Sequence, residues 1–204
     1  ALEERKMDIH WYTMARLQKG FDKATAELWR KSGCLFILMG LESANAELAQ
    51  KMVKGTDNRL TETVLKNLHD ADIFTFAFLF FGFPGETLAT ATETLQFIRK
   101  NRDVINSIGD GVFYLQKTTP VFRNHQAFGI TPNAQDLEDD WSSSIRFEIK
   151  DAMSTEQALL FNHRFREEMG LSYRSGLWQN LSRIGFFLYL SRYGKQKVLE
   201  HNGL

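Results

Sequence analysis

The sequence predicts an α/β fold in which about four parallel strands alternate with helices, followed by a mainly helical C-terminal extension. Short apolar runs of strand length recur four times, at residues 8–12, 34–39, 74–81 and 108–116. Segments with apolar residues at helical spacing separate these runs, at residues 21–31, 44–53, 60–71 and 86–102. This alternation predicts right-handed βαβ units and a parallel sheet. Four strands do not close a barrel, so a doubly wound sheet and a portion of a (β/α) barrel both remain open.

The second and third runs are the strongest strand predictions. Residues 34–39 are continuously apolar, which is typical of a strand covered on both faces. Residues 74–81 are rich in aromatic side chains, which favour strands. We assign the phenylalanine stripe of residues 74–83 to the hydrophobic core. The helix before the second run is predicted to end at Ser32-Gly33, since glycine is the usual left-handed residue after a helix.

The character of the chain changes after Gly129, and we place a domain boundary near residue 132. Residues 1–131 are then the sheet domain, and residues 132–204 are a mainly helical extension. Within the extension we expect a polar surface connection at residues 133–140, an extended stretch at 141–150, and helices at 155–169 and 177–193. The last helix is predicted to turn Leu181, Ile184 and Leu188 inward.

Composition excludes several classes of function. The sequence has 25 basic and 25 acidic residues, so nothing favours a nucleic-acid partner. Its single cysteine, Cys34, permits no disulfide within the chain and no cysteine cluster for a metal, which favours a cytoplasmic protein. No apolar run reaches the roughly 20 residues of a membrane span. The first residues lack an initiator Met and do not form a signal peptide, so we expect a chain that begins within a domain.

Polar and glycine-rich segments follow the predicted strands, where ligands bind in parallel α/β folds. Glu42 and Ser43 follow the second run, and Lys54 ends the next helix. A carboxylate, a hydroxyl and an ammonium can bind a polar ligand. A helix cap and a favourable interaction with the helix dipole explain the same residues without a ligand. The loop that contains Gly82, Pro84 and Gly85 either lets the backbone approach a ligand closely or is a tight strand-to-helix turn.

Other residues give weaker signals. Arg16 is a loop cation that is equally well explained as solvated surface. Cys34 lies in an apolar strand and is best explained as a small core residue. The five histidines have no spacing typical of a metal site or a hydrolase triad.

Four segments, taken together and in order, resemble the radical S-adenosylmethionine (SAM) superfamily. They are Gly-Leu-Glu-Ser at 40–43, Met-Val-Lys-Gly at 52–55, Phe-Phe-Gly-Phe-Pro-Gly-Glu-Thr at 80–87 and Thr-Thr-Pro-Val-Phe at 118–122. In the last segment Thr118 replaces the usual glycine. The resemblance spans roughly residues 8–125 and is closest to the group that often carries an N-terminal cobalamin-binding domain, although methylthiotransferase-like relatives share these motifs.

The resemblance implies a six-stranded partial (β/α) barrel, of which this chain holds the third to sixth strands. SAM then lies across the strand ends. The resemblance places Glu42 and Ser43 at the ribose or amino group and Lys54 at the methionine carboxylate, with Arg16 as a weaker carboxylate candidate. The implied adenine contacts are the loop of Gly82, Pro84 and Gly85 and the end of the sixth strand near Tyr114.

The resemblance also implies cofactors that this chain cannot hold alone. The family's CxxxCxxC loop, which ligates a [4Fe–4S] cluster, is absent from the sequence, so we expect the isolated chain to be inactive. The intact enzyme is then expected to cleave SAM reductively to a 5′-deoxyadenosyl radical, with an electron donor such as flavodoxin or ferredoxin and, in some relatives, cobalamin. The substrate and the catalytic residues stay open. A cluster-free barrel that acts as a protein-interaction module is the main alternative, and an unrelated (β/α) enzyme is another.

Overall fold

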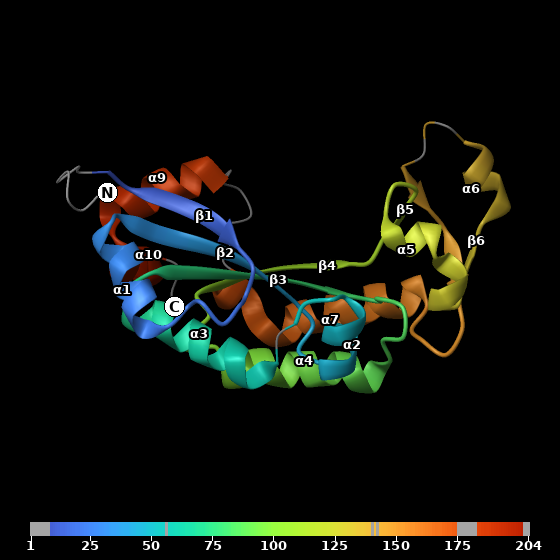
Figure 1. Cartoon of the computed structure of the whole chain (residues 1–204), viewed down its shortest axis with the longest axis horizontal. Helices are drawn as coiled ribbons and strands as arrows, with labels where there is room; N and C mark the ends of the chain where they lie inside the picture. The colour runs from blue at the N-terminus through green and yellow to red at the C-terminus, as the bar shows by residue number, and fades with distance from the viewer. Residues whose placement is uncertain (1–8, 56, 140, 142, 175–182, 202–204) are drawn as a thin grey trace.

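The computed structural model describes residues 9–55, 57–139, 141, 143–174 and 183–201. Its centre is a four-stranded, all-parallel sheet in the order β1-β2-β3-β4 (Figure 1). The strands are β1 (Trp11–Ala15), β2 (Cys34–Glu42), β3 (Phe74–Phe81) and β4 (Ser107–Val112). The predicted α/β fold with about four parallel strands is confirmed.

Three strands differ from their predicted bounds. β1 lies about three residues later than the predicted run, and β2 continues through Gly40 to Glu42. It can continue because β3 keeps offering backbone partners, with Gly40 opposite Phe78. β4 ends at Val112, whereas residues 115–116 form a separate short strand in another sheet. The predicted strand at 108–116 is therefore two strands.

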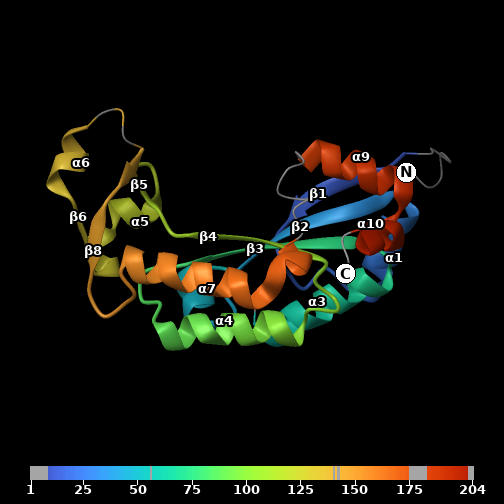
Figure 2. The same ribbon diagram turned by 180° about the vertical axis from the view of Figure 1, so that it is seen from behind.

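One face of the sheet is covered by α1 (Lys23–Lys31), α3 (Asn58–Asp70) and α4 (Leu88–Lys100), as Figures 1 and 2 show. Each helix begins at a side-chain cap, supplied by Asp22, Asp57 and Thr87 respectively, which satisfies a free backbone N–H. The short helix α2 (Ala46–Lys51) lies beyond the end of β2 and is capped by Asn45. Alternate strand residues form the core beneath these helices: Ile37, Met39, Ala77, Leu79 and Phe81.

The C-terminal helices α9 (Arg183–Tyr193) and α10 (Lys195–His201) pack on the opposite face, near the start of the strands (Figure 2). Phe186 and Leu190 are buried there against Phe36 and Phe74. The prediction that Ile184 and Leu188 face inward is wrong, since both are exposed, and Leu181 lies outside the described residues. The helix presents its aromatic face to an aromatic sheet, where edge-to-face ring contacts such as Phe36–Phe186 at 4.9 Å form.

Residues 113–150 form a small lobe away from the large sheet (Figure 1). Its core is Leu115, Ile130 and Ile145. Two antiparallel pairs build it: β5 (Leu115–Gln116) with β7 (Ser144–Ile145), and β6 (Ile130–Pro132) with β8 (Phe147–Ile149). The lobe also holds α5 (Pro120–Arg123), the 3₁₀ helix η1 (His125–Phe128) and α6 (Ala134–Glu138). The boundary near residue 132 stays a prediction.

Helix α7 (Thr155–Arg174) returns from the lobe and completes the helical layer along β3 and β4 (Figure 2). It buries Ala158, Phe161 and Phe165. The ring centroids of Phe161 and Phe165 lie 4.9 and 5.2 Å from that of Phe81. Gly170 departs from helical geometry with φ 73° and kinks the helix. Among the helices described, none combines the length and apolarity that a bilayer crossing requires.

Candidate functional site

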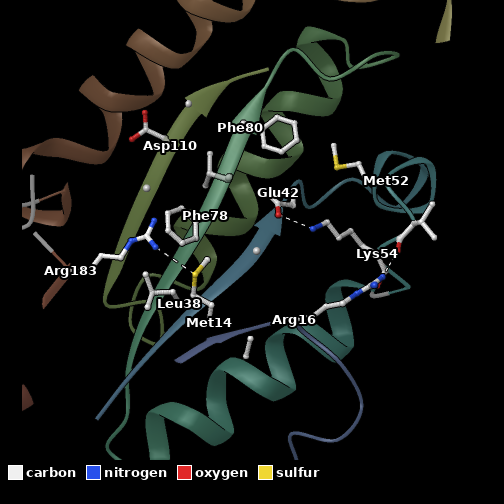
Figure 3. Close-up of a pocket in the computed structure, with 16 residues that line it drawn as sticks. Met14, Arg16, Leu38, Glu42, Met52, Lys54, Phe78, Phe80, Asp110 and Arg183 are labelled. Carbon is white, nitrogen blue, oxygen red and sulfur yellow. Dashed lines mark hydrogen bonds and ion pairs between the residues drawn. The ribbon is translucent and has the colours of Figure 1, made fainter. Parts of the chain in front are cut away.

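A cleft of about 790 Å³ lies over the carboxyl halves of the four strands, on the face opposite α1, α3 and α4 (Figure 3). Every strand contributes to its lining, together with the loop after β1, the loop after α2 and the first described residue of α9. The volume falls in the range usual for small-molecule sites. Ligands of parallel α/β folds bind at this end of the strands.

Glu42 reaches the cleft because β2 is irregular at its end. The register with β3 shifts between Gly40 and Glu42, and Glu42 adopts a left-handed φ of 62°. A bulge of this kind re-aims a side chain, and a left-handed non-glycine residue is a strained geometry that clusters at functional sites. A Cβ at Gly40 would lie 2.4 Å from Oε1 of Glu42, so the neighbouring glycine makes room for this carboxylate.

Lys54 is placed by the C-terminal turn of α2. The Val53 N–H donates to the Gln50 carbonyl and the Lys54 N–H to the Ala49 carbonyl, which is the Schellman pattern. Val53 occupies the left-handed position of this motif with φ 55°, where glycine is usual. The turn directs Nζ of Lys54 to Oε1 of Glu42 at 2.8 Å (Figure 3).

Arg16 fastens this turn to the loop after β1. Its Nε donates to the Lys54 carbonyl at 3.2 Å, and its Nη2 donates to the Val53 carbonyl. Both carbonyls lie just past the C-terminal cap of α2, and the guanidinium supplies donors to them. Arg16 thus lines the cleft beside Lys54, with part of its donor capacity used on the backbone.

Two glycines of β4 line the floor of the cleft. Gly109 and Gly111 line it, whereas the intervening Asp110 directs its buried carboxylate to Arg166 of α7, 2.7 Å from Nε. A Cβ at Gly109 would lie 2.7 Å from the Phe76 ring, but a Cβ at Gly111 would meet no atom within 4 Å. Gly109 therefore lets the aromatic rings of β3 lie across the strand, and Gly111 leaves open space.

The predicted site residues divide into two groups. Glu42, Lys54 and Arg16 line the cleft together, and the remaining five do not. The hydroxyl of Ser43 lies behind the sheet, 3.2 Å from that of Thr94. Tyr114 is 60% exposed, two residues past the end of β4.

The loop of Gly82, Pro84 and Gly85 packs against other parts of the fold. Gly82 has φ 84°, and a Cβ there would lie 2.7 Å from Cβ of Ala158 in α7. A Cβ at Gly85 would meet the flexible end of Lys51. Both contacts are with protein, so the tight turn accounts for this glycine pattern.

Glu86 closes that loop from within the core. Its Oε2 accepts a hydrogen bond of 2.6 Å from the Gly82 N–H, whereas Oε1 has no hydrogen-bond partner among the described residues. Burial raises the pKa of this carboxyl to about 7, and the backbone hydrogen bonds oppose the rise only partly.

Sequence reasoning missed several cleft residues, chiefly Met14, Met52, Phe78 and Arg183. The assignment of the whole phenylalanine stripe to the core is also wrong. Phe76, Phe78 and Phe80 lie on the cleft face and remain half-buried, because strand side chains alternate between faces. That alternation was a readable signal for Phe78. Arg183 has no comparable signal, since only the tertiary return of α9 brings it to the cleft.

Within the part of the chain that the structure describes, no group of three or more His, Cys, Asp or Glu side chains could hold a metal ion. Cys34 is fully buried in β2, and burial raises the pKa of its thiol to about 12. It therefore behaves as the small core residue that the sequence predicts, since a thiolate is the metal-binding form.

Comparisons with known proteins find a curated relative by sequence and similar folds among solved structures. No family model matches the chain. A bacteriochlorophyllide d C-12(1)-methyltransferase from Chlorobaculum tepidum is 35% identical over 102 residues, which are 48% of this chain and 22% of the relative. The radical S-adenosylmethionine methyltransferase TsrM from Kitasatospora setae, solved with cobalamin and a [4Fe–4S] cluster, aligns with a TM-score of 0.51 at 20% identity, over 62% of this chain and 26% of TsrM.

A third comparison covers nearly the whole chain. The cobalamin-dependent S-adenosylmethionine radical enzyme OxsB aligns with a TM-score of 0.62 at 14% identity, over 99% of this chain and 34% of OxsB. The matches thus span about a fifth of the curated relative and a quarter to a third of the two solved structures. The resemblance that the sequence motifs predict is confirmed at the level of the fold.

Proposed function

From the radical SAM fold of this chain, we propose that it belongs to the radical SAM superfamily and supplies the SAM-binding and substrate-pocket part of such an enzyme. The observation that carries the proposal is the Glu42–Lys54 pair at the strand-end cleft. In the proposed reaction SAM accepts one electron, its C5′–S bond breaks, and methionine and a 5′-deoxyadenosyl radical are formed.

The chemistry of the cleft matches the polar groups of SAM. Lys54 offers an ammonium to the methionine carboxylate, with Arg16 beside it. Glu42 offers acceptors to the amino group or the ribose hydroxyls. The open space at Gly111 leaves room for a flat ring. In this proposal the chain's own residues bind and orient SAM. The expected contacts of Ser43 with the ribose or amino group, and of Gly82, Pro84, Gly85 and Tyr114 with adenine, stay predictions, since none of these residues lines the cleft.

The residues present do not fit the [4Fe–4S] cluster. Cys34 is the only cysteine of the sequence, and it is buried with a strongly raised thiol pKa. We propose that the cluster ligands lie outside this sequence and that the electron comes from a cytoplasmic donor such as flavodoxin or ferredoxin. Methyl transfer, with cobalamin as a further cofactor, is the reaction that the curated relative and TsrM favour.

Among the described residues no strand pairs with the outer edge of β1. This edge favours a second candidate, a non-catalytic barrel that binds a protein partner, because a free strand edge can pair with another chain. One experiment separates the two. The intact protein is reconstituted anaerobically with iron and sulfide, reduced, and its electron paramagnetic resonance spectrum is recorded with and without SAM. A cluster signal that changes on adding SAM supports the enzyme. A well-folded intact protein that takes up no cluster contradicts it and leaves the interaction module.

A further inference from the structure

We propose that the aromatic half of the cleft takes a flat, apolar substrate that carries a carboxylate, and that Arg183 binds this carboxylate. The inference rests on the proposed function, because it assigns the second reactant of the same site. It differs from the SAM assignment in the residues that carry it. SAM is assigned to Glu42 and Lys54 at the polar end, and the substrate to Phe78 and Arg183 at the other end.

The aromatic half of the cleft is a continuous apolar surface. Phe78 lines the cleft, and Phe76 continues the aromatic surface on the same face of β3, outside the cleft lining. Their ring centroids are 4.7 Å apart, and both side chains remain half-buried. A second hollow of about 200 Å³ adjoins them, between the sheet and α9. Leu38, Phe78 and Arg183 line both hollows and so form the partition between them. Partly exposed rings of this kind are typical anchors for a planar ligand.

The backbone of β4 keeps this surface flat. Gly109 has no side chain to lift the rings of Phe76 and Phe78, and Gly111 opens the floor beyond them. Any larger residue at position 109 would contact the two rings at 3.1 Å or less. The space above the rings is therefore a built feature of the two strands.

Arg183 lies over this surface, in contact with an aromatic ring and a thioether sulfur. Its Cζ lies 5.7 Å from the centroid of the Phe78 ring, and its Nη1 lies 3.6 Å from Sδ of Met14 (Figure 3). No ion pair joins Arg183 to a carboxylate of any described residue. A guanidinium that stacks on a ring keeps its in-plane N–H donors free, and their fork matches a carboxylate.

The charges of the cleft favour an anion at this end. Lys54 is neutralised by Glu42, and Arg16 spends donors on two backbone carbonyls. Asp110, the other acidic residue at the cleft, directs its carboxylate to Arg166. Within the described part of the chain, no carboxylate forms an ion pair with Arg183. A purely solvated role would not require its placement between the Phe78 ring and Met14.

The volume of the cleft allows for two reactants. A transfer reaction requires both molecules to lie in contact within one site. The polar residues and Arg183 occupy opposite ends of the 790 Å³ space (Figure 3). A substrate whose carboxylate meets Arg183 would lay its apolar body across Phe78 toward the SAM end.

The test uses two matched probes, pyrenebutyrate and its uncharged amide, with the intact protein. Their dissociation constants are measured by fluorescence anisotropy for the wild type, Arg183→Gln and Arg192→Gln; Arg192 is an exposed cation of the same helix away from the cleft. We expect the wild type and Arg192→Gln to prefer the acid by about tenfold or more, and Arg183→Gln to lose this preference. Phe78→Leu should weaken both probes by similar factors.

The inference is overturned if the acid preference survives in Arg183→Gln, if acid and amide bind the wild type equally, or if neither probe binds. SAM affinity is measured on the same samples by calorimetry, and Arg183→Gln should bind SAM as the wild type does. Wild-type protein that binds the acid selectively but not SAM contradicts the proposed function and leaves the Arg183 site standing. The two failures are therefore distinguishable.

Discussion

Nζ of Lys54 lies 2.8 Å from Oε1 of Glu42, and the two side chains keep 26% and 18% of their surface exposed. The pair is partly buried and lines the cleft, so we expect it to act on ligand binding. Lys54→Met should raise the SAM dissociation constant by about tenfold or more, because a hydrogen bond to a charged group is lost. Calorimetry on the intact protein measures this.

Lys51→Met is the matched control, since Lys51 belongs to α2 but does not line the cleft. It should bind SAM with wild-type affinity. Equal SAM affinity of Lys54→Met and Lys51→Met would argue against a role for Lys54 in the site.

The left-handed position of Val53 predicts a stabilising substitution. Val53 is 77% exposed with φ 55°, so its side chain contributes strain and little burial. A non-glycine residue in this conformation costs roughly 1–2 kcal/mol, and glycine avoids this strain. Glycine also loses more conformational entropy on folding, which offsets part of that gain. Val53→Gly should therefore exceed Val53→Ala in free energy of unfolding by roughly 1 kcal/mol, as measured in urea. An alanine variant that is equally stable would show that the turn is relaxed.

Gly111 offers a way to fill the cleft without disturbing the fold. A Cβ there meets no atom within 4 Å, and β-branched residues suit strands. Gly111→Val should keep the wild-type melting temperature within a few degrees but weaken SAM binding by roughly tenfold or more, since the added side chain occupies ligand space. Gly20→Val is the control, because Gly20 is equally open and lies elsewhere. Unchanged SAM affinity in Gly111→Val would move the binding site away from this floor.

The contact between Gly82 and Ala158 predicts a specific packing cost. Gly82→Ala adds a Cβ 2.7 Å from that of Ala158 at a position with φ 84°. Gly129→Ala shares the left-handed φ, at 67°, but meets no atom within 4 Å. Both variants should be destabilised, and Gly82→Ala by about 1–3 kcal/mol more, because overpacking adds to backbone strain. Denaturant unfolding measures the free energy of unfolding of both variants. Similar losses in both would mean that α7 shifts away from the added Cβ at little cost.

Glu86 predicts a pH dependence of stability. Its pKa is raised by burial from 4.5 to about 7, so the folded protein binds a proton that the unfolded chain has released over this interval. The contribution to stability is therefore fully present below pH 4.5 and is lost as the pH rises to 7, on the order of 3 kcal/mol in total. Glu86→Gln, which stays neutral, should gain relative to wild type as the pH rises from 5 to 7. A constant difference across this range would mean that Glu86 titrates normally.

The sequence predicted the features that depend on a single helix or strand. The apolar runs and helical spacings identify the sheet and its helical layer. The end of a strand predicts Glu42 and the end of the next helix predicts Lys54, and both line the cleft. Contacts between distant elements were out of reach. The buried face of α9 depends on the aromatic sheet it meets, so its own periodicity misassigned Ile184 and Leu188. The return of α9 to the sheet also brings Arg183 to the cleft. The direction of the Asp110 carboxylate depends on its contact with Arg166 of α7.

The packing of Phe186 on Phe36 and Phe74 also has a consequence for protein synthesis. The later of the two strands that carry Phe36 and Phe74 leaves the ribosome roughly 100 residues before α9 does, which is about 5–20 s at ordinary elongation rates. During this interval one face of the nascent sheet has no helix to cover it. Chaperone binding to the growing chain is expected to concentrate in that window and to end when α9 emerges.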